Sequence, residues 1–305
     1  MSKEIKSFKT YDEQLDILKK KGLICDNNSL EILKRNNYYF LINRYKDCFI
    51  KKGVKPNEFI KGTHFNEIVA LYHFDRDLRS LVLKYIINLE NTLKSIISYE
   101  FSKVYGYGYL DRANFTYDVG LTSEVILEKR ISNLFNSIKS TIAQGKRQNR
   151  YIKYYSKNYS KIPLWVVIND LSLGLTIKFY KLLDSNLKET IALKLNVTSQ
   201  DLESFLDILS FFRNLAAHNQ RLFDERCNYK INKTYIHELL MIDDCDNLMA
   251  LMITFKILLL DNEFRVLHQE INNLLAKLDK DVDTVTNIPV INKMGFEKFD
   301  ELLNI

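Results

Sequence analysis

Residues 64–104 are 41 consecutive residues without a glycine or a proline. Hydrophobic side chains recur along this segment at intervals of three and four residues, which is the spacing of one face of an α-helix. The residues that keep this period are Ile68, Leu71, Tyr72, Leu78, Leu81, Val82, Tyr85, Ile86, Leu89, Leu93, Ile96 and Ile97. The segment therefore predicts one long helix, or two helices in direct succession.

The rest of the chain also favours helices. Its 305 residues include only nine Gly and three Pro, which is few for an all-β protein with many tight turns. Hydrophobic periodicity and capping residues predict further helices over residues 10–24, 28–42, 123–144, 186–196, 234–241, 246–260 and 261–279. We expect an all-α fold.

One linker is predicted near the N-terminus. Residues 51–63 contain two Gly and one Pro between segments with helical periodicity. This predicts a small N-terminal helical module over residues 1–60, a helical bundle over residues 61–270 and a C-terminal helical extension over residues 271–305.

Neither a metal centre nor a membrane segment is expected. The four Cys residues show no CxxC spacing, and no convincing acidic cluster suggests a metal site. No window of about 18 apolar residues is free of charge, and the first residues lack an apolar signal core. We expect a cytoplasmic protein with reduced thiols and without a metal or other cofactor.

Positive charge is concentrated in the first half of the chain. Residues 1–161 carry 29 Lys and Arg against 17 Asp and Glu, whereas residues 162–305 carry 15 against 21. A basic half suggests a polyanion as partner. The alternative is that Lys-rich helices simply form a soluble surface.

The most basic stretch is also rich in tyrosine. From Lys129 to Lys161 there are nine Lys and Arg and no acidic residue. Lys and Arg neutralise phosphates, and tyrosine rings can stack on unpaired bases. We expect RNA contacts here, with a solvated basic loop as the alternative. The predicted RNA-binding residues are Lys146, Arg147, Arg150, Tyr151, Lys153, Tyr154 and Lys157, together with Arg44 and Arg221 elsewhere in the chain.

A second aromatic and basic mixture lies earlier in the chain. Tyr38, Tyr39, Phe40 and Tyr45 stand next to Arg35, Arg44 and Lys46. Such a mixture can stack on bases. The alternative is that these aromatic side chains belong to the hydrophobic core.

The strongest candidate for a functional site is the segment FFRNLAAHNQRLF at residues 211–223. It holds Arg213 and His218 with four residues between them. A guanidinium can bind a phosphate through two hydrogen bonds, and an imidazole can transfer protons near neutral pH. A capping sequence at Thr198 predicts a helix that runs into this segment, so we expect the motif inside a packed helix. Phosphodiester chemistry is the function that this pair suggests.

On a regular helix the motif cannot form a complete site. Five residues correspond to a rotation of about 500° and a rise of about 7.5 Å, so Arg213 and His218 diverge by about 140°. Asn214 and His218 share a face. Cleavage of RNA by its own 2′-hydroxyl needs a base and an acid, and one His serves one proton transfer at a time. Two facing copies would supply both, which predicts a homodimer.

Structural roles are the alternative for these charged residues. Arg213 can belong to an ion pair, and His218 can be hydrogen-bonded in the core. Arg76, Arg79 and Glu90 interrupt the apolar pattern of residues 64–104. Because a buried charge needs a partner, they predict internal ion pairs or supports for the site.

Several segments resemble known protein families. Arg213-Asn214, three further residues and His218 resemble the R-x4-H signature of HEPN ribonucleases. The surrounding chain resembles the bacterial abortive-infection Abi family, in particular its AbiD/AbiF branch. The similar segments are TYDEQLDILKKKGL, NYYFLINRYKD, LYHFDRDLRSLV, IINLENTLKS, IPLWVVINDLSLG and RNLAAHNQRLFDE, which follow in family order over residues 10–225. Arg44 departs from the pattern, where a Gly is expected.

The resemblance implies a HEPN-type helical bundle that dimerises and acts as a metal-independent endoribonuclease toxin against phage. It implies catalytic roles for Arg213 and His218, with Asn214 as the intervening polar residue. It further implies a small structured non-coding RNA as partner and antitoxin. Control by a nucleotidyltransferase is not implied, because Gln220 stands where those toxins have Tyr. A non-catalytic RNA-binding protein and a phage-sensing interaction module remain alternatives.

Overall fold

The computed structural model describes residues 7–53, 57–116, 123–243 and 246–305. Within these ranges the regular elements are helices, and extended pairing is limited to two isolated bridges, Ile24 with His64 and Ile50 with Phe59. The expected all-α fold is therefore confirmed.

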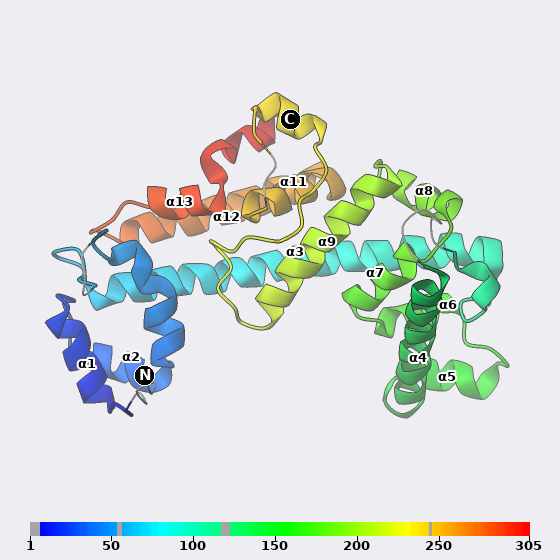
Figure 1. The fold of residues 1–305 in the computed structure, drawn as a ribbon, viewed down its shortest axis with the longest axis horizontal. Coiled ribbons are helices and arrows are strands. Elements are labelled where there is room, and N and C mark those ends of the chain that lie inside the picture. The colour runs from blue at the N-terminus through cyan, green and yellow to red at the C-terminus, as the bar shows by residue number, and fades with distance from the viewer. Residues whose placement is uncertain (1–6, 54–56, 117–122, 244–245) are drawn as a thin grey trace.

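Helix α3 (Phe65–Tyr105) is the longest element and runs without a break through 41 residues. Of the two predicted forms of this segment, the single helix is the observed one. At a rise of 1.5 Å per residue, it is about 60 Å long. The structure packs helices along most of this length, as Figure 1 shows.

The N-terminal helices are shorter than predicted. Helix α1 (Tyr11–Lys20) begins with a capping box between Thr10 and Glu13. Helix α2 (Ser29–Arg35) ends well before residue 42, because Asn36 is extended and its side chain donates to the Ile32 carbonyl oxygen. A separate π-helical turn, η1, follows at residues 39–43.

The remaining helices follow in chain order. The α-helices are α4 (Glu124–Gln148), α5 (Arg150–Asn158), α6 (Leu164–Val167), α7 (Leu173–Lys181), α8 (Ser185–Leu193), α9 (Ser199–Ala217), α10 (Tyr235–Leu240), α11 (Leu248–Leu258), α12 (Asp261–Asp281) and α13 (Ile288–Met294). Short 3₁₀ turns are η2 (Lys46–Phe49), η3 (Arg112–Asn114), η4 (Ile168–Asp170), η5 (Phe296–Lys298) and η6 (Asp300–Asn304).

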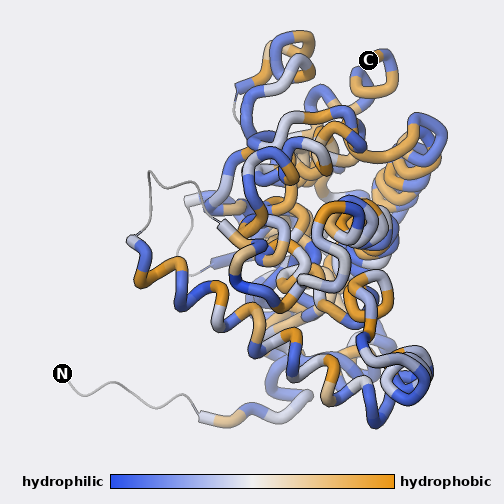
Figure 2. Tube along the Cα trace, turned by 90° about the vertical axis from the view of Figure 1, so that its right-hand side faces the viewer, coloured by the Kyte–Doolittle hydropathy of each residue, from blue (hydrophilic) through white to orange (hydrophobic). Residues whose placement is uncertain are grey.

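Helix α3 organises the arrangement in space. In Figure 1, α1 and α2 lie below one end of α3, and α4 and α5 lie below the other end. Helices α11, α12 and α13 lie on the opposite side, and α9 crosses α3 near its middle. Hydrophobic and hydrophilic residues alternate along the helices in Figure 2, as expected where one face of each is buried.

One hydrophobic cluster connects the three predicted parts of the chain. It extends from Leu15 in α1 to Leu302 near the C-terminus. The Ile24 N–H also donates to the Thr63 carbonyl oxygen at 2.9 Å, across the predicted boundary at residue 60. Helix α12 is continuous across residue 271, so it spans the predicted boundary there. The division into 1–60, 61–270 and 271–305 stays a prediction.

None of the helices in the described ranges combines the length and the hydrophobicity that crossing a lipid bilayer demands.

Candidate functional site

Helix α9 carries Arg213 and Asn214 but ends before His218. Its start is the predicted one, because the Thr198 hydroxyl accepts the Asp201 N–H at 3.1 Å. Its last residue is Ala217. His218 is the C-terminal cap, so the expectation that the whole motif lies inside a packed helix is wrong.

The helix end has a specific backbone cause. Asn219 adopts a left-handed conformation with a φ of 53°. The Gln220 N–H donates to the Leu215 carbonyl oxygen at 3.0 Å, which forms a Schellman-type end. Asparagine tolerates this conformation better than most residues, so Asn219 is the sequence signal that marks the end. The His218 N–H still donates to the Asn214 carbonyl oxygen at 3.1 Å, so the chain leaves the helical path only after His218.

The three motif side chains are available for a ligand. Asn214 and His218 are exposed, and Arg213 is half-buried. Within the described ranges, the Arg213 guanidinium has no ion pair, and its Nε is buried without a hydrogen-bond partner. A buried donor without an acceptor costs about 1–3 kcal/mol, so an external acceptor would be favourable. The alternatives of an ion-paired Arg213 and a core His218 are wrong.

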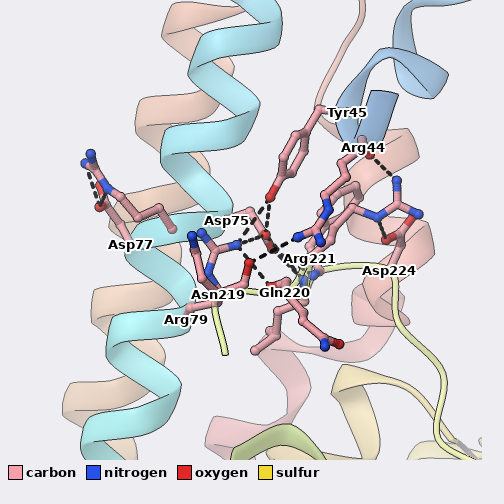
Figure 3. A network of polar contacts seen from close by, with 12 residues as sticks. Arg44, Tyr45, Asp75, Asp77, Arg79, Asn219, Gln220, Arg221 and Asp224 are labelled. Atoms are coloured by element: carbon pink, nitrogen blue, oxygen red, sulfur yellow. Dashed lines mark hydrogen bonds and ion pairs between the residues drawn. The ribbon is translucent and has the colours of Figure 1, made fainter. Parts of the chain in front are cut away.

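The segment after His218 is bound tightly to α3. The Asp75 carboxylate is fully buried, and its Oδ1 accepts the Phe223 N–H at 2.9 Å and the Leu222 N–H at 3.1 Å. Its Oδ2 accepts the Tyr45 hydroxyl at 2.7 Å and forms an ion pair with Arg79. Figure 3 shows these contacts converging on one carboxylate. We call this set, Tyr45, Asp75 and Arg79, the α3 clamp.

Arg79 completes the clamp. It is only 4% exposed, and its Nη1 also donates to the Gln220 carbonyl oxygen at 3.2 Å. The predicted internal ion pair is therefore confirmed for Arg79, and the same side chain holds the segment that follows His218. Arg76 instead forms an ion pair with Asp77 at the surface, at 2.9 Å. Glu90 forms the predicted internal ion pair, with Lys94 at 2.7 Å.

Ionisation of the clamp follows from its burial. Desolvation raises the pKa of the Asp75 carboxyl, opposed by the Arg79 guanidinium and by the hydrogen bonds from Tyr45 and the backbone. Burial and the neighbouring Asp75 also raise the pKa of Tyr45. The phenol therefore keeps its proton and remains a donor to the carboxylate.

Two predicted RNA-binding residues also hold this segment. The Arg44 Nη1 donates to the Asn219 carbonyl oxygen at 3.0 Å. Arg221 donates to the Arg44 carbonyl oxygen, and its Nε lies 2.7 Å from Asp224 Oδ1. The dashed lines in Figure 3 join Arg44 to Asn219 and to Arg221, and Arg221 to Asp224. Both arginines thus have intramolecular partners, and their contact with RNA stays a prediction.

The other predicted RNA-binding residues lie together at the α4–α5 junction. They are helical, not part of a loop. Lys146 and Arg147 lie in the last turn of α4, and the others are on α5. We call the seven residues the α5 face: Lys146, Arg147, Arg150, Tyr151, Lys153, Tyr154 and Lys157. All seven residues are exposed. The five Lys and Arg side chains of the α5 face have no ion pair with any residue in the described ranges.

The α5 face is held by one asparagine. The Asn149 Oδ1 accepts the Tyr151 N–H at 2.8 Å and so caps α5. Its Nδ2 donates to both Asp170 carboxylate oxygens, at 2.7 and 2.8 Å. Ile152 is fully buried against Gly145 of α4. These contacts fix the orientation of α5, so the backbone that carries its cations and tyrosines is held in place.

The motif and the α5 face are connected to different parts of α3. Arg79 contacts Gln220, whereas the Lys94 Nζ donates to the carbonyl oxygen of Asn169, next to Asp170, at 3.4 Å. The 15 residues between these α3 positions correspond to about 22 Å of helix. The two regions are therefore anchored at separate positions along α3.

No group of three His, Cys, Asp or Glu side chains in the described ranges is placed to hold a metal ion. The thiols of Cys25, Cys48 and Cys227 are free. Cys245 lies outside the described residues.

Over the described residues, the protein is all-helical and carries an Arg, an Asn and a His without side-chain partners at a helix end. A model of the Abi-like protein family matches residues 31–224, which is more than half of the chain. The chain therefore belongs to the Abi-like family, and this membership indicates a role in abortive infection. Searches of the curated proteins and of the solved structures found no match.

Proposed function

We propose that this protein is a HEPN-type, metal-independent endoribonuclease that acts as a toxin in cytoplasmic abortive-infection defence. The observation that carries the proposal is the availability of Arg213, Asn214 and His218. Their side chains lack intramolecular partners in the described ranges, although the segment that follows them is clamped to α3. The clamp holds the backbone beside these groups, while the groups themselves stay free to bind a phosphodiester.

The reaction would be transfer of a phosphodiester to the neighbouring 2′-hydroxyl. One imidazole takes the proton of the 2′-hydroxyl while its oxygen bonds to phosphorus. The bond from phosphorus to the 5′-oxygen breaks, and a protonated imidazole gives that oxygen a proton. The products are a 2′,3′-cyclic phosphate and a 5′-hydroxyl. Arg213 would stabilise the negative charge of the phosphorane, and Asn214 would hydrogen-bond a phosphate oxygen or orient His218.

Two chains would complete the site. Because one His cannot be base and acid at the same moment, a homodimer that brings two motifs together supplies both groups. The exposure of His218 and Asn214 at a helix end leaves them accessible to a second copy.

A small structured non-coding RNA is the partner that we propose for the α5 face. The five cations of the α5 face have no ion pairs in the described ranges and can bind phosphates. Tyr151 and Tyr154 are 69% and 54% exposed and can stack on unpaired bases. Such an RNA would restrain the toxin. Since the α5 face and the motif lie along different parts of α3, a non-catalytic RNA-binding protein is the second candidate.

The proposal is tested by separating cleavage from binding. Arg213→Ala and His218→Ala should abolish toxicity and RNA cleavage but leave RNA affinity within about twofold, while chelation with EDTA should leave wild-type cleavage unchanged. The matched control is His73→Ala, because His73 is exposed beside α12 and outside the motif. Loss of RNA affinity in the motif variants, or activity that survives both, would reject the catalytic assignment.

The RNA partner is tested on protein purified from its own locus. Wild-type and His218→Ala proteins should both carry one discrete RNA, visible in the ratio of absorbance at 260 and 280 nm and identified by sequencing. Clean protein in both preparations would reject the RNA partner, and the nuclease would rest on cleavage of added RNA alone.

A further inference from the structure

Two aromatic rings stand exposed next to the segment that follows His218. Tyr39 is 63% exposed and Phe40 is 41% exposed, whereas Leu41 and Ile42, which follow in the same π-helical turn, are buried. The Asn37 Oδ1 accepts the N–H groups of Tyr39 and Phe40, at 2.9 and 3.4 Å. The turn is therefore anchored on its inner side and presents two rings to solvent. π-helical turns of this kind are frequent at functional sites.

Arg44 connects these rings to the motif. Its Cζ lies 3.9 Å from the centre of the Phe40 ring, which is a cation–π contact. Its Nη1 donates to the carbonyl oxygen of Asn219, the residue directly after His218, at 3.0 Å. The rings of Tyr39 and Phe40 are edge to face, with centres 6.4 Å apart. We call Tyr39, Phe40 and Arg44 the aromatic platform.

The aromatic mixture at residues 38–45 thus divides into two sets. Tyr45 is buried in the α3 clamp, and Tyr38 is half-buried. These two are core residues, as one alternative predicts. A core role does not account for Tyr39 and Phe40. A core ring stabilises the fold because it is removed from water, and these two rings remain exposed to water.

The chemistry of the aromatic platform fits one class of ligand. Exposed rings beside a guanidinium bind unpaired bases by stacking, while the guanidinium attracts the adjoining phosphate. A paired helix would hide its base faces and could not use the rings. Because Arg44 contacts both Phe40 and the Asn219 carbonyl oxygen, a base stacked on the platform would lie beside the residue that follows His218.

We propose that the aromatic platform is a substrate subsite, at which an unpaired base of an RNA strand stacks beside the scissile phosphate. This inference rests on the proposed nuclease function and adds that the cleaved position lies in single-stranded RNA. It also assigns Arg44 a second contact, with the backbone of that strand, in addition to its bond with Asn219.

The test uses full-length His218→Ala protein, so that the bound RNA stays intact. The probes are a 12-nucleotide single-stranded RNA with 2-aminopurine near its centre and a fully paired duplex of the same sequence. Tyr39→Ala combined with Phe40→Ala should raise the Kd for the single strand about tenfold or more, as expected for the loss of one stacked base. It should also abolish quenching of 2-aminopurine fluorescence and leave the Kd for the duplex unchanged.

Two controls separate stacking from folding. Tyr39→Phe combined with Phe40→Tyr keeps both rings and should restore affinity and quenching. Tyr99→Ala removes a ring that is 66% exposed on α3 and should change neither. A double-alanine variant that binds and quenches like the His218→Ala parent would overturn the subsite, and so would failure of the parent to bind the single strand.

Failure of the subsite and failure of the nuclease give different results. If cleavage by the wild-type chain requires His218 but the alanine variants keep their affinity and quenching, the nuclease stands and the subsite is rejected. If the platform variants lose single-strand binding while His218→Ala still cleaves, the subsite stands and the catalytic role of His218 is rejected.

Discussion

At the scale of single residues, Asp75 determines whether the segment after His218 keeps its conformation. Asp75→Ala removes the acceptor of two backbone N–H groups and leaves Arg79 as a buried charge without its carboxylate. Breaking a buried pair from one side costs about 3–5 kcal/mol. We expect a loss of that size in the free energy of unfolding, measured by urea denaturation.

Asp77→Ala is the matched control for this prediction. Asp77 lies two residues away on the same helix, and its pair with Arg76 is at the surface, with 51% of the arginine side chain exposed. Removing a surface pair changes stability by less than about 1 kcal/mol. Equal losses for the two variants would mean that the α3 clamp contributes nothing beyond a surface ion pair.

The clamp also marks where sequence reasoning about the site stops. Arg213, Asn214 and His218 were recognisable because the motif is local. The backbone N–H groups that Asp75 binds lie 147 and 148 residues away in the sequence, and no local pattern joins positions that far apart. The helix end at Ala217 was missed for a different reason. Its signal is one residue, Asn219, within an otherwise continuous helical pattern.

At the scale of elements, Gly145 sets how closely α5 packs on α4. A Cβ at Gly145 would lie 2.5 Å from Ile152 Cδ1 and 3.2 Å from its Cβ. Ile152 is fully buried and has little room to move. We expect Gly145→Ala to displace α5 and cost about 1–3 kcal/mol through overpacking, less the gain of up to about 1 kcal/mol in helix propensity.

The displacement of α5 is measured by amide hydrogen exchange. Amides of residues 150–158 should exchange faster in Gly145→Ala, and adding Ile152→Val, which removes the closest methyl group, should recover part of their protection. Gly174→Ala in α7 is the control, because no described atom beyond the local helix backbone lies within 4 Å of the added Cβ. Unchanged exchange in α5 would show that Ile152 adapts without moving its helix.

Prediction of elements succeeded where the hydrophobic period was long and unbroken, as in residues 64–104. It failed over residues 28–42, where helical periodicity continues past Arg35. There the side chains of Asn36 and Asn37 hydrogen-bond to nearby backbone, which stops one helix and starts the π-helical turn. Such local competition depends on side-chain geometry that a periodic pattern does not contain.

At the scale of the whole molecule, His268 connects the C-terminal turns to α12. Its ring is 2% exposed and stacks on Phe299 with centres 4.1 Å apart, and Nε2 lies 3.3 Å from the Phe299 carbonyl oxygen. Burial lowers the pKa of His268 below its usual 6.5, although the carbonyl oxygen and Asp300 oppose this. As the pH falls through 6.5, His268 therefore takes up a proton more readily in the unfolded chain than in the folded protein.

Stability should accordingly fall as the pH drops from 7.5 to 5.5, and His268 should contribute up to about 1.4 kcal/mol per pH unit to the fall. His268→Gln retains a donor for the Phe299 carbonyl oxygen and removes the titration. Its unfolding midpoint in urea should change less over this interval than that of the wild type. Identical pH dependence in both proteins would exclude His268 as the responsible group.

The proposed homodimer makes a quantitative prediction for mixed chains. If one His is the base and the other the acid, a dimer of wild type and His218→Ala lacks one of them and is inactive. After unfolding and refolding together at equal amounts, wild-type pairs would be about one quarter of all dimers. RNA cleavage should then fall to about one quarter of that of pure wild type at the same total concentration.

His73→Ala serves as the control in the same mixture, because it lies outside the motif and should leave cleavage unchanged. Sedimentation of the mixture verifies that the chains associate. The decisive quantity is the shape of the curve, because a shared site makes activity follow the square of the wild-type fraction. Activity proportional to that fraction would assign a complete site to each chain, and the second proton transfer would then require a group other than the partner's histidine.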